Sequence, residues 1–193
     1  SDMRLRGESV AEYVSADAMD RAAAIRERLL SRPAEYADSL GWLDCEDATR
    51  GAANVILDKA GEIRQNADAL IVVGVGGSNQ ASRAVIDALG ARDIEIVWLG
   101  NTLSAYEFAR ETRRLEGKSV YVNVIAKNFA TLEPGAHHRA LRAWLREQYG
   151  ENELARRIVF TGTPASRLHE IARENGHLFL PFPEDVGGRF SAF

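Results

Sequence analysis

Residues 69–78 read ALIVVGVGGS, and this stretch decides the fold class. The run from Ala69 to Val75 is short and almost entirely apolar, as expected of a strand that is covered on both faces of a sheet. The glycines that follow permit a tight turn, and a helical pattern then runs from Ser78 to Leu89. A strand, a glycine-rich turn and a helix in this order predict the first parallel βαβ unit of an α/β domain.

The same alternation of strand and helix continues along the rest of the chain. Further strands are predicted at residues 94–99, 120–125, 157–161 and 177–182, and helices at 104–115, about 133–149 and 166–175. Pro181 cannot donate to a ladder, so the last strand is expected at an edge. Right-handed crossovers then place helices on both faces of an open parallel sheet of about five strands, a flavodoxin-like, doubly wound fold.

The first third of the chain is predicted to be helical. Apolar residues at spacings of three and four indicate one helix from Ser9 to Leu30, which Pro33 ends, and a second at about residues 46–66. Residues 39–44 form a turn between them. We therefore divide the chain into an N-terminal helical segment, residues 1–66, that packs on a sheet domain of residues 67–193.

Composition excludes several classes of protein. The net charge is −4, and 24 Lys and Arg are scattered among 28 Asp and Glu, which argues against a nucleic-acid-binding protein. No apolar stretch approaches the roughly 20 residues that a membrane span needs. Cys45 is the single cysteine, so neither an intrachain disulfide nor a cysteine-rich metal site is expected, and a cytoplasmic location fits.

The loop after the first strand contains a candidate anion site. Gly76 and Gly77 let the backbone approach a ligand, and the start of the next helix adds free amides and a positive dipole end. Ser78 either donates to a phosphate oxygen or serves as an ordinary N-cap of that helix. A dinucleotide fingerprint is a poor fit, because Asn79 stands where its third glycine is required.

The loop after the third strand has similar chemistry. Lys127 brings a cation to the ligand edge of the sheet, and Asn128 and Thr131 bring hydrogen-bond donors. Glu133 and Pro134 are typical of a helix start. The alternative interpretation is a solvated lysine followed by a capped helix. Two such loops on nearby strands predict one phosphate site between them. The function to which the family resemblance described below leads is expected to need neither a metal nor an organic cofactor.

Two adjacent histidines, His137 and His138, fall on the helix that follows. Neighbouring residues on a helix point in different directions, so a shared metal site or catalytic pair is not expected. We predict that both histidines lie at the surface.

Several motifs resemble the glucose-6-phosphate isomerase family. Residues 69–89 resemble the bacterial pattern VVxGIGGSYLGARAxxEAL, and residues 125–134 resemble ISKSGTTTEP, with Phe129 matching the animal-type SKTFTTQE. Residues 185–191 resemble DDVGGR[FY]S. Residues 39–44 and 99–101 resemble the family's DSLGW and VGNN stretches. The order and spacing of these matches extend from about Ser39 to the last residue.

The resemblance implies a SIS (sugar isomerase) domain that binds a hexose 6-phosphate. The parent enzyme would be a homodimer that interconverts glucose 6-phosphate and fructose 6-phosphate in glycolysis and gluconeogenesis. The family's substrate-binding positions correspond here to Gly76, Gly77, Ser78, Lys127, Asn128, Phe129, Ala130, Thr131 and Gly188. Arg189 matches the arginine that stabilises the enediolate, a task that suits a permanently charged guanidinium with several donors.

Departures from the family pattern leave an alternative function open. Ala126 and Ala130 replace a serine and a threonine, and each hydrogen bond lost to a charged group costs about 1.5–3 kcal/mol. The family's glutamate base, ring-opening histidine and late lysine fall beyond Phe193, so we expect that the C-terminal half is absent and that this chain is inactive alone. The alternative is a SIS domain that senses a sugar phosphate without catalysis. Use of mannose 6-phosphate by the parent enzyme is also left open.

Overall fold

The computed structural model describes residues 14–90 and 93–187, and it contains the predicted five-stranded parallel sheet. The strands are β1 (Ala69–Val73), β2 (Glu95–Leu99), β3 (Val120–Ile125), β4 (Ile158–Gly162) and β5 (Leu178–Pro181). Their order is β2-β1-β3-β4-β5, and every neighbouring pair is parallel. This order confirms the doubly wound α/β prediction, and β5 lies at an edge as Pro181 required.

The central strands are buried on both faces, as their continuous apolar sequence predicted. Ile71 of β1 pairs with Val97 of β2 and with Val122 of β3, and none of the three is more than 3% exposed. Phe160 of β4 is fully buried. Burial of such side chains contributes most of the stabilisation of the domain, at about 1.5–3 kcal/mol for each.

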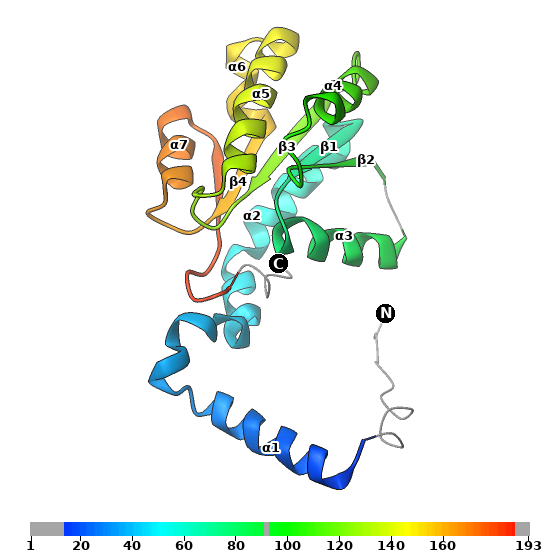
Figure 1. Cartoon of the computed structure of the whole chain (residues 1–193). Coiled ribbons are helices and arrows are strands. Elements are labelled where there is room, and N and C mark those ends of the chain that lie inside the picture. Colours follow the sequence, from blue (N-terminus) through cyan, green and yellow to red (C-terminus); the bar gives the residue numbers. More distant parts are fainter. Residues whose placement is uncertain (1–13, 91–92, 188–193) are drawn as a thin grey trace.

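Helices cover both faces of the sheet (Figure 1). On one face lie α2 (Cys45–Asn66) and α3 (Gly77–Leu89), and on the other lie α4 (Ala105–Arg114), α5 (Leu132–Tyr149), α6 (Glu151–Arg157) and α7 (Arg167–Asn175). Helix α6 was not predicted. It exists because Gly150, with φ of 80°, ends α5 and because the next seven residues carry acids in the first turn and arginines in the last.

The N-terminal helix α1 (Ala16–Leu30) differs from the other helices. The predicted start at Ser9 lies outside the described residues. Among those described, Val14 and Ser15 precede the helix, and the Ser15 hydroxyl caps it by accepting from the Ala18 amide at 3.2 Å. None of its residues is buried, and Figure 1 shows it standing away from the sheet. Two short 3-10 helices, η2 (Ala34–Ser39) and η3 (Gly41–Asp44), connect it to α2. The division of the chain at residue 66 stays a prediction.

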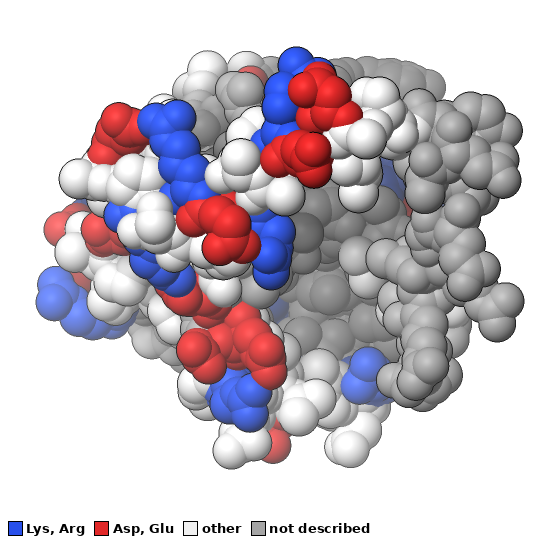
Figure 2. Space-filling model, turned by 90° about the horizontal axis from the view of Figure 1, so that it is seen from below, with Lys and Arg blue, Asp and Glu red and all other residues white. Residues whose placement is uncertain are grey.

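Charges on the face shown in Figure 2 are mixed. Blue and red side chains alternate there, and no extended field of one sign stands out among the residues described. Within the described residues, no helix combines the length and the apolar character that a bilayer crossing requires.

Candidate functional site

The topology of the sheet brings the two predicted loops together. Strand β1 lies between β2 and β3, and the chain leaves β1 through α3 toward β2 but leaves β3 through α5 toward β4. The two connections therefore diverge, and such a switch point leaves a crevice at the carboxyl ends of the strands. Because Val73 pairs with Val124, the loops after β1 and β3 begin at the same level on neighbouring strands.

The loop after β1 is shaped by glycines. Gly76 has φ of 58° and ψ of −123°, a conformation that other residues rarely adopt, and α3 begins directly after it. A Cβ on Gly74 would lie 2.7 Å from the Ser78 carbonyl oxygen, so the chain passes too closely there for any side chain. Gly100, which follows β2 and has φ of 106°, also packs closely: a Cβ there would lie 2.8 Å from the Gly74 carbonyl oxygen.

Ser78 is not the N-cap of α3, so that interpretation of the sequence is wrong. Gly76 occupies the N-cap position, and the Ser78 amide donates to the Val75 carbonyl at 3.3 Å. The Ser78 side chain is half-buried and makes no hydrogen bond to any other described residue. Its hydroxyl is therefore available to a ligand beside the positive end of the helix.

The loop after β3 is a compact turn that leads into α5. The Asn128 side-chain oxygen accepts from the Ala130 amide at 3.1 Å, and Phe129 between them has φ of 63°. Thr131 occupies the N-cap position of α5, yet its hydroxyl makes no capping hydrogen bond and is exposed. Like Ser78, Thr131 offers an unused hydroxyl at the start of a helix.

Lys127 lies differently from the prediction. The half-buried Lys127 ammonium donates to the Val186 carbonyl at 3.0 Å, so the solvated-lysine interpretation is wrong. The Lys127 carbonyl accepts from the Thr163 amide at 2.8 Å and from the Thr163 hydroxyl at 2.5 Å. The Gly41 amide in turn donates to the Asp185 carbonyl at 3.0 Å. Lys127 therefore holds together the loops after β3, β4 and β5.

These contacts join three of the sequence motifs at one edge of the sheet. The motif at residues 39–44 and the loop after β3 both hold the segment of residues 185–187. Gly188 and Arg189 lie outside the described residues.

Sequence reasoning missed three residues that shape this edge. Gly41 leaves room for the Asp185 carboxylate, which a Cβ there would displace, and Thr163 holds the Lys127 carbonyl. Asn79 is fully buried, and its amide group donates to the Leu99 carbonyl at 3.4 Å, which ties the loop after β1 to β2. Of the three, only Gly41 gave a signal in the sequence, as a glycine inside an otherwise bulky turn. Thr163 and Asn79 bond to backbone carbonyls, and such partners leave no trace in sequence.

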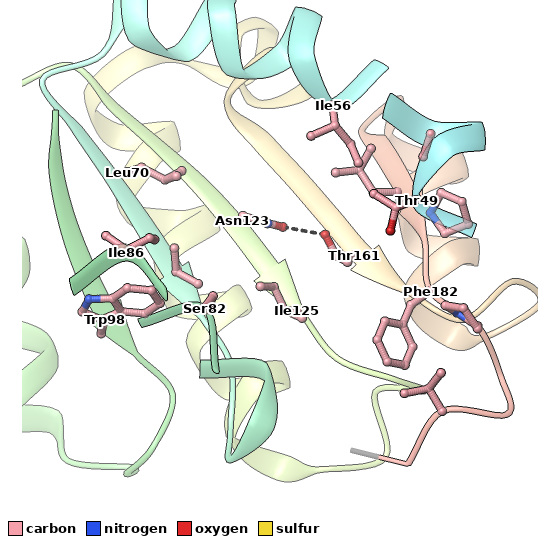
Figure 3. A pocket seen from close by; sticks show the side chains of 16 residues that line it. Thr49, Ile56, Leu70, Ser82, Ile86, Trp98, Asn123, Ile125, Thr161 and Phe182 are labelled. Atoms are coloured by element: carbon pink, nitrogen blue, oxygen red, sulfur yellow. Dashed lines mark hydrogen bonds between the residues drawn. The ribbon is translucent and has the colours of Figure 1, made fainter. Parts of the chain in front are cut away.

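A cavity on the face of the sheet is a poorer candidate for the ligand site. It holds about 380 Å³ between α2 and α3, and mostly apolar side chains line it, among them Ile56, Leu70 and Trp98 (Figure 3). Its central polar residues are joined to each other, because the Thr161 hydroxyl donates to the Asn123 side-chain oxygen at 3.1 Å. A sugar phosphate needs several charged or polar partners, and the carboxyl edge offers them.

The prediction that His137 and His138 lie at the surface is wrong. They are 5% and 6% exposed, because α5 is covered by α4 on the side of His137 and by β4 on the side of His138. Nδ1 of His137 lies 3.0 Å from the Glu133 carbonyl oxygen. Nε2 of His138 has no partner, and burial, reinforced by the positive charge of nearby side chains, lowers the pKa of His138 to about 4. The described residues contain no cluster of three or more potential metal ligands.

Comparisons with known proteins find relatives of one family. The family model described as phosphoglucose isomerase matches residues 56–193. The glucose-6-phosphate isomerase of Staphylococcus epidermidis is 36% identical over 163 residues, which cover 80% of this chain and 37% of that protein. The enzyme of the same name from Shouchella clausii is 34% identical over 182 residues, which cover 87% of this chain and 40% of that protein. The chain therefore spans about two fifths of the length of the curated relatives it matches.

Solved structures share the fold. A hypothetical protein of Thermus thermophilus superposes with a TM-score of 0.79 at 27% identity, over 91% of this chain and 43% of that one. A glucose-6-phosphate isomerase of Chlamydia trachomatis gives a TM-score of 0.62 at 24% identity, over 76% of this chain and 27% of that one, which shows a common fold.

Proposed function

The chain belongs to the phosphoglucose isomerase family, and from this premise we propose that it forms the sugar-phosphate-binding part of a glucose-6-phosphate isomerase. One observation carries the proposal. The unused hydroxyls of Ser78 and Thr131 stand at the starts of α3 and α5, on neighbouring loops at the switch point of the sheet. Both helix starts lie at the carboxyl edge of the sheet, and a phosphate dianion is a ligand that free hydroxyls and helix N-termini attract.

In this proposal both loops contact the phosphate group of the sugar. Gly76, Gly77 and Ser78 supply the backbone approach and one hydroxyl, and residues 127–131 supply the second side of the site. Lys127 contributes its charge and also braces the segment of residues 185–187. The sugar then extends from the phosphate toward Gly188 and Arg189, which follow that segment in the chain.

The proposed reaction moves a proton between C1 and C2 of the open-chain sugar by way of an enediolate. Negative charge develops on oxygen in that intermediate, and the guanidinium of Arg189 stabilises it without gaining or losing a proton. Turnover also needs a base and a group that opens the ring. We assign substrate binding to this chain and turnover to a protein of the relatives' full length. Homodimeric assembly, a cytoplasmic location and the absence of a cofactor belong to the same proposal.

A second candidate function rests on Ala126 and Ala130. Ala126 is 7% exposed and belongs to the core, whereas Ala130 is exposed in the loop after β3. At neither position does the loop offer the hydroxyl that the family pattern has. A weaker phosphate site of this kind suits a domain that senses a sugar phosphate and does not transform it.

An isomerase assay on the longer protein that contains this chain separates the two functions. We expect conversion of fructose 6-phosphate to glucose 6-phosphate, with a loss of about 10²–10³ in kcat for Arg189→Ala and a smaller loss for Arg189→Lys. Arg173→Ala, at an exposed position on α7, is the matched control and is expected to be unchanged. Saturable binding of fructose 6-phosphate with no turnover in the longer protein would support the sensor instead.

A further inference from the structure

Four aromatic rings form a row that starts in the loop after β3 and crosses the domain behind it. The ring centroids of Phe129 and His138 are 6.1 Å apart, those of His138 and Phe160 are 5.0 Å apart, and those of Phe160 and His177 are 5.3 Å apart. All three contacts are edge to face, with interplanar angles of 63–67°. His138 therefore stands directly between the loop and the core.

The ring of Phe129 holds the loop in its conformation. Phe129 has φ of 63°, in the left-handed region that a bulky residue adopts only when its surroundings compensate. Its side chain lies over Gly135, where a Cβ would be 3.7 Å from the ring, and against His138. The one charge in the loop, on Lys127, is bonded to the Val186 carbonyl and does not reach into this row.

The surroundings of His138 favour the neutral ring. Among the described residues, its Nε2 has no hydrogen-bond partner, and no carboxylate is among the groups that act on the ring. Arg139 and Arg142 face it from α5, and His177 faces it from the connection between α7 and β5. Glu151 of α6 is paired with Arg142, and β4 presents only the apolar ring of Phe160. A proton on His138 would therefore be unsolvated and unpaired among positive groups.

We propose that His138 is a positioning residue for the phosphate loop, residues 127–131: its neutral ring holds Phe129 in place, and protonation of the ring releases the loop. The proposal rests on the proposed function only in naming the loop's ligand. Ligand binding would then weaken as the solution becomes acidic, because the closed conformation of the loop does not accommodate a protonated His138 ring. The release is a local opening and needs no unfolding of the core.

This coupling has a defined slope. The ring titrates near pH 4 with the loop closed and would titrate nearer its ordinary pH 6.5 once released, so opening becomes more favourable by at most about tenfold for each pH unit between those values. Above pH 6.5 the opening equilibrium should not depend on pH. If a side chain that does not titrate held Phe129 in place, the opening equilibrium would not depend on pH.

Amide hydrogen exchange on the ligand-free chain, followed by NMR between pH 4.5 and 7.5 and corrected for intrinsic rates, measures the opening. The Thr163 amide, which donates to the Lys127 carbonyl, reports on the loop, and the Val122 amide in the buried strand β3 reports on global unfolding. The variants are His138→Phe, which keeps an aromatic ring, and His138→Gln. His137→Gln is the matched control, since His137 is equally buried but faces Phe108 on α4.

In the wild-type chain and in His137→Gln, we expect Thr163 to exchange faster than Val122 at each pH and to gain at every step below pH 6.5, by a factor that does not exceed about tenfold per pH unit. In whichever His138 variant retains native protection at Val122, the slope should vanish. A slope that persists in that variant overturns the proposal, as does a wild-type Thr163 amide that exchanges only with Val122. Because no ligand is present, either failure is separate from a failure of sugar-phosphate binding.

Discussion

The two edges of the sheet use polar residues in opposite ways. At the amino edge, the Glu62 carboxylate of α2 accepts from Lys59 at 2.9 Å, from the Tyr121 hydroxyl at 2.9 Å and from Arg156 at 2.8 Å. The hydroxyl of Tyr149 donates to the Lys118 carbonyl at 2.6 Å. These groups satisfy one another and tie α2, β3, α5 and α6 together.

Arg157 extends the same network. Its guanidinium lies 3.8 Å above the ring of Tyr149 and donates to the Val120 carbonyl and to the Ser119 hydroxyl, both at 3.1 Å. The Arg157 side chain is 12% exposed, so it is a permanent charge held by partners within the protein. Polar residues at this edge have a structural role.

At the carboxyl edge, the loops are fixed by bonds to main-chain groups, some from other main-chain groups and some from side chains such as Lys127 and Thr163. Backbone bonds from Gly41 and Thr163 fix the loops, while the hydroxyls of Ser78 and Thr131 stay unengaged. The difference teaches that residue type alone does not mark a binding site. What marks it is a polar side chain whose position is fixed by other atoms and whose own bonds are left unmade.

The largest expected effect is the loss of stability in acid, and the regions behind the two edges should lose it at different pH values. The folded pKa of His138, about 4, lies below its unfolded value near 6.5, so its contribution of about 3 kcal/mol is present above pH 6.5 and is lost as the pH falls toward 4. Burial likewise lowers the pKa of His177, so the stability that its neutral ring contributes is also lost as the pH falls. Hydrogen bonds from Lys59, Tyr121 and Arg156 outweigh the burial that opposes them and lower the pKa of Glu62, so its contribution is lost only at more acidic pH.

Urea unfolding at a series of pH values measures both steps. His138→Phe should reduce the step between pH 6.5 and 4, leaving the part that His177 contributes, and should not change the more acidic one. An unchanged step in that variant would assign the acid sensitivity to other groups.

Removal of the carboxylate at the amino edge has the next largest effect. Glu62→Ala leaves the Tyr121 hydroxyl without its acceptor, and we expect a loss of about 2 kcal/mol in the free energy of unfolding. Ligand binding should be unaffected. Glu35→Ala removes an exposed ion pair with Arg28 and is expected to change stability by less than about 0.5 kcal/mol. Equal effects of the two substitutions would remove the contrast between a structural network and a surface pair.

Gly74→Ala tests the close approach in the loop after β1. The added Cβ meets the carbonyl group of Ser78, which is backbone and cannot move aside freely, so we expect a loss of roughly 1–2 kcal/mol together with weaker ligand binding. Gly61→Ala in α2 meets nothing within 4 Å and should be neutral or slightly stabilising. A neutral Gly74→Ala variant with normal binding would show that the loop adapts easily.

The smallest effect on stability is expected at the proposed site itself. Ser78→Ala and Thr131→Ala remove hydroxyls that have no partner in the described protein, so the free energy of unfolding should change by no more than about 0.5 kcal/mol. Thermal unfolding of the two variants measures this. A loss of 1 kcal/mol or more would mean that the hydroxyls are structural.

Local pattern accounts for most of the fold, and distant contacts account for what the pattern did not show. The apolar runs predicted all five strands, and Pro181 predicted which one lies at the edge. The loops after β1 and β3 were located because parallel topology brings the carboxyl ends of neighbouring strands together. Helix α6 was missed because a short segment after Gly150 carries no apolar periodicity long enough to detect.

Side-chain partners could not be predicted in the same way. The bond from Lys127 reaches a carbonyl 59 residues further along the chain, and a carbonyl has no signature in sequence. His138 was assigned to the surface because its residue type suggests exposure, whereas its burial depends on how α5 crosses β4. Such outcomes follow from packing, which a single sequence does not display.

The most direct test of the ligand site is an NMR titration of this chain with fructose 6-phosphate, with inorganic phosphate in parallel. We predict saturable shifts of the amides of Gly77, Ser78 and residues 127–131, and a roughly tenfold or greater weakening in Ser78→Ala and in Thr131→Ala, since each removes a hydrogen bond to a charged group. Shifts confined to the cavity near Trp98, or binding that neither substitution weakens, would contradict the assignment of the site to the carboxyl edge.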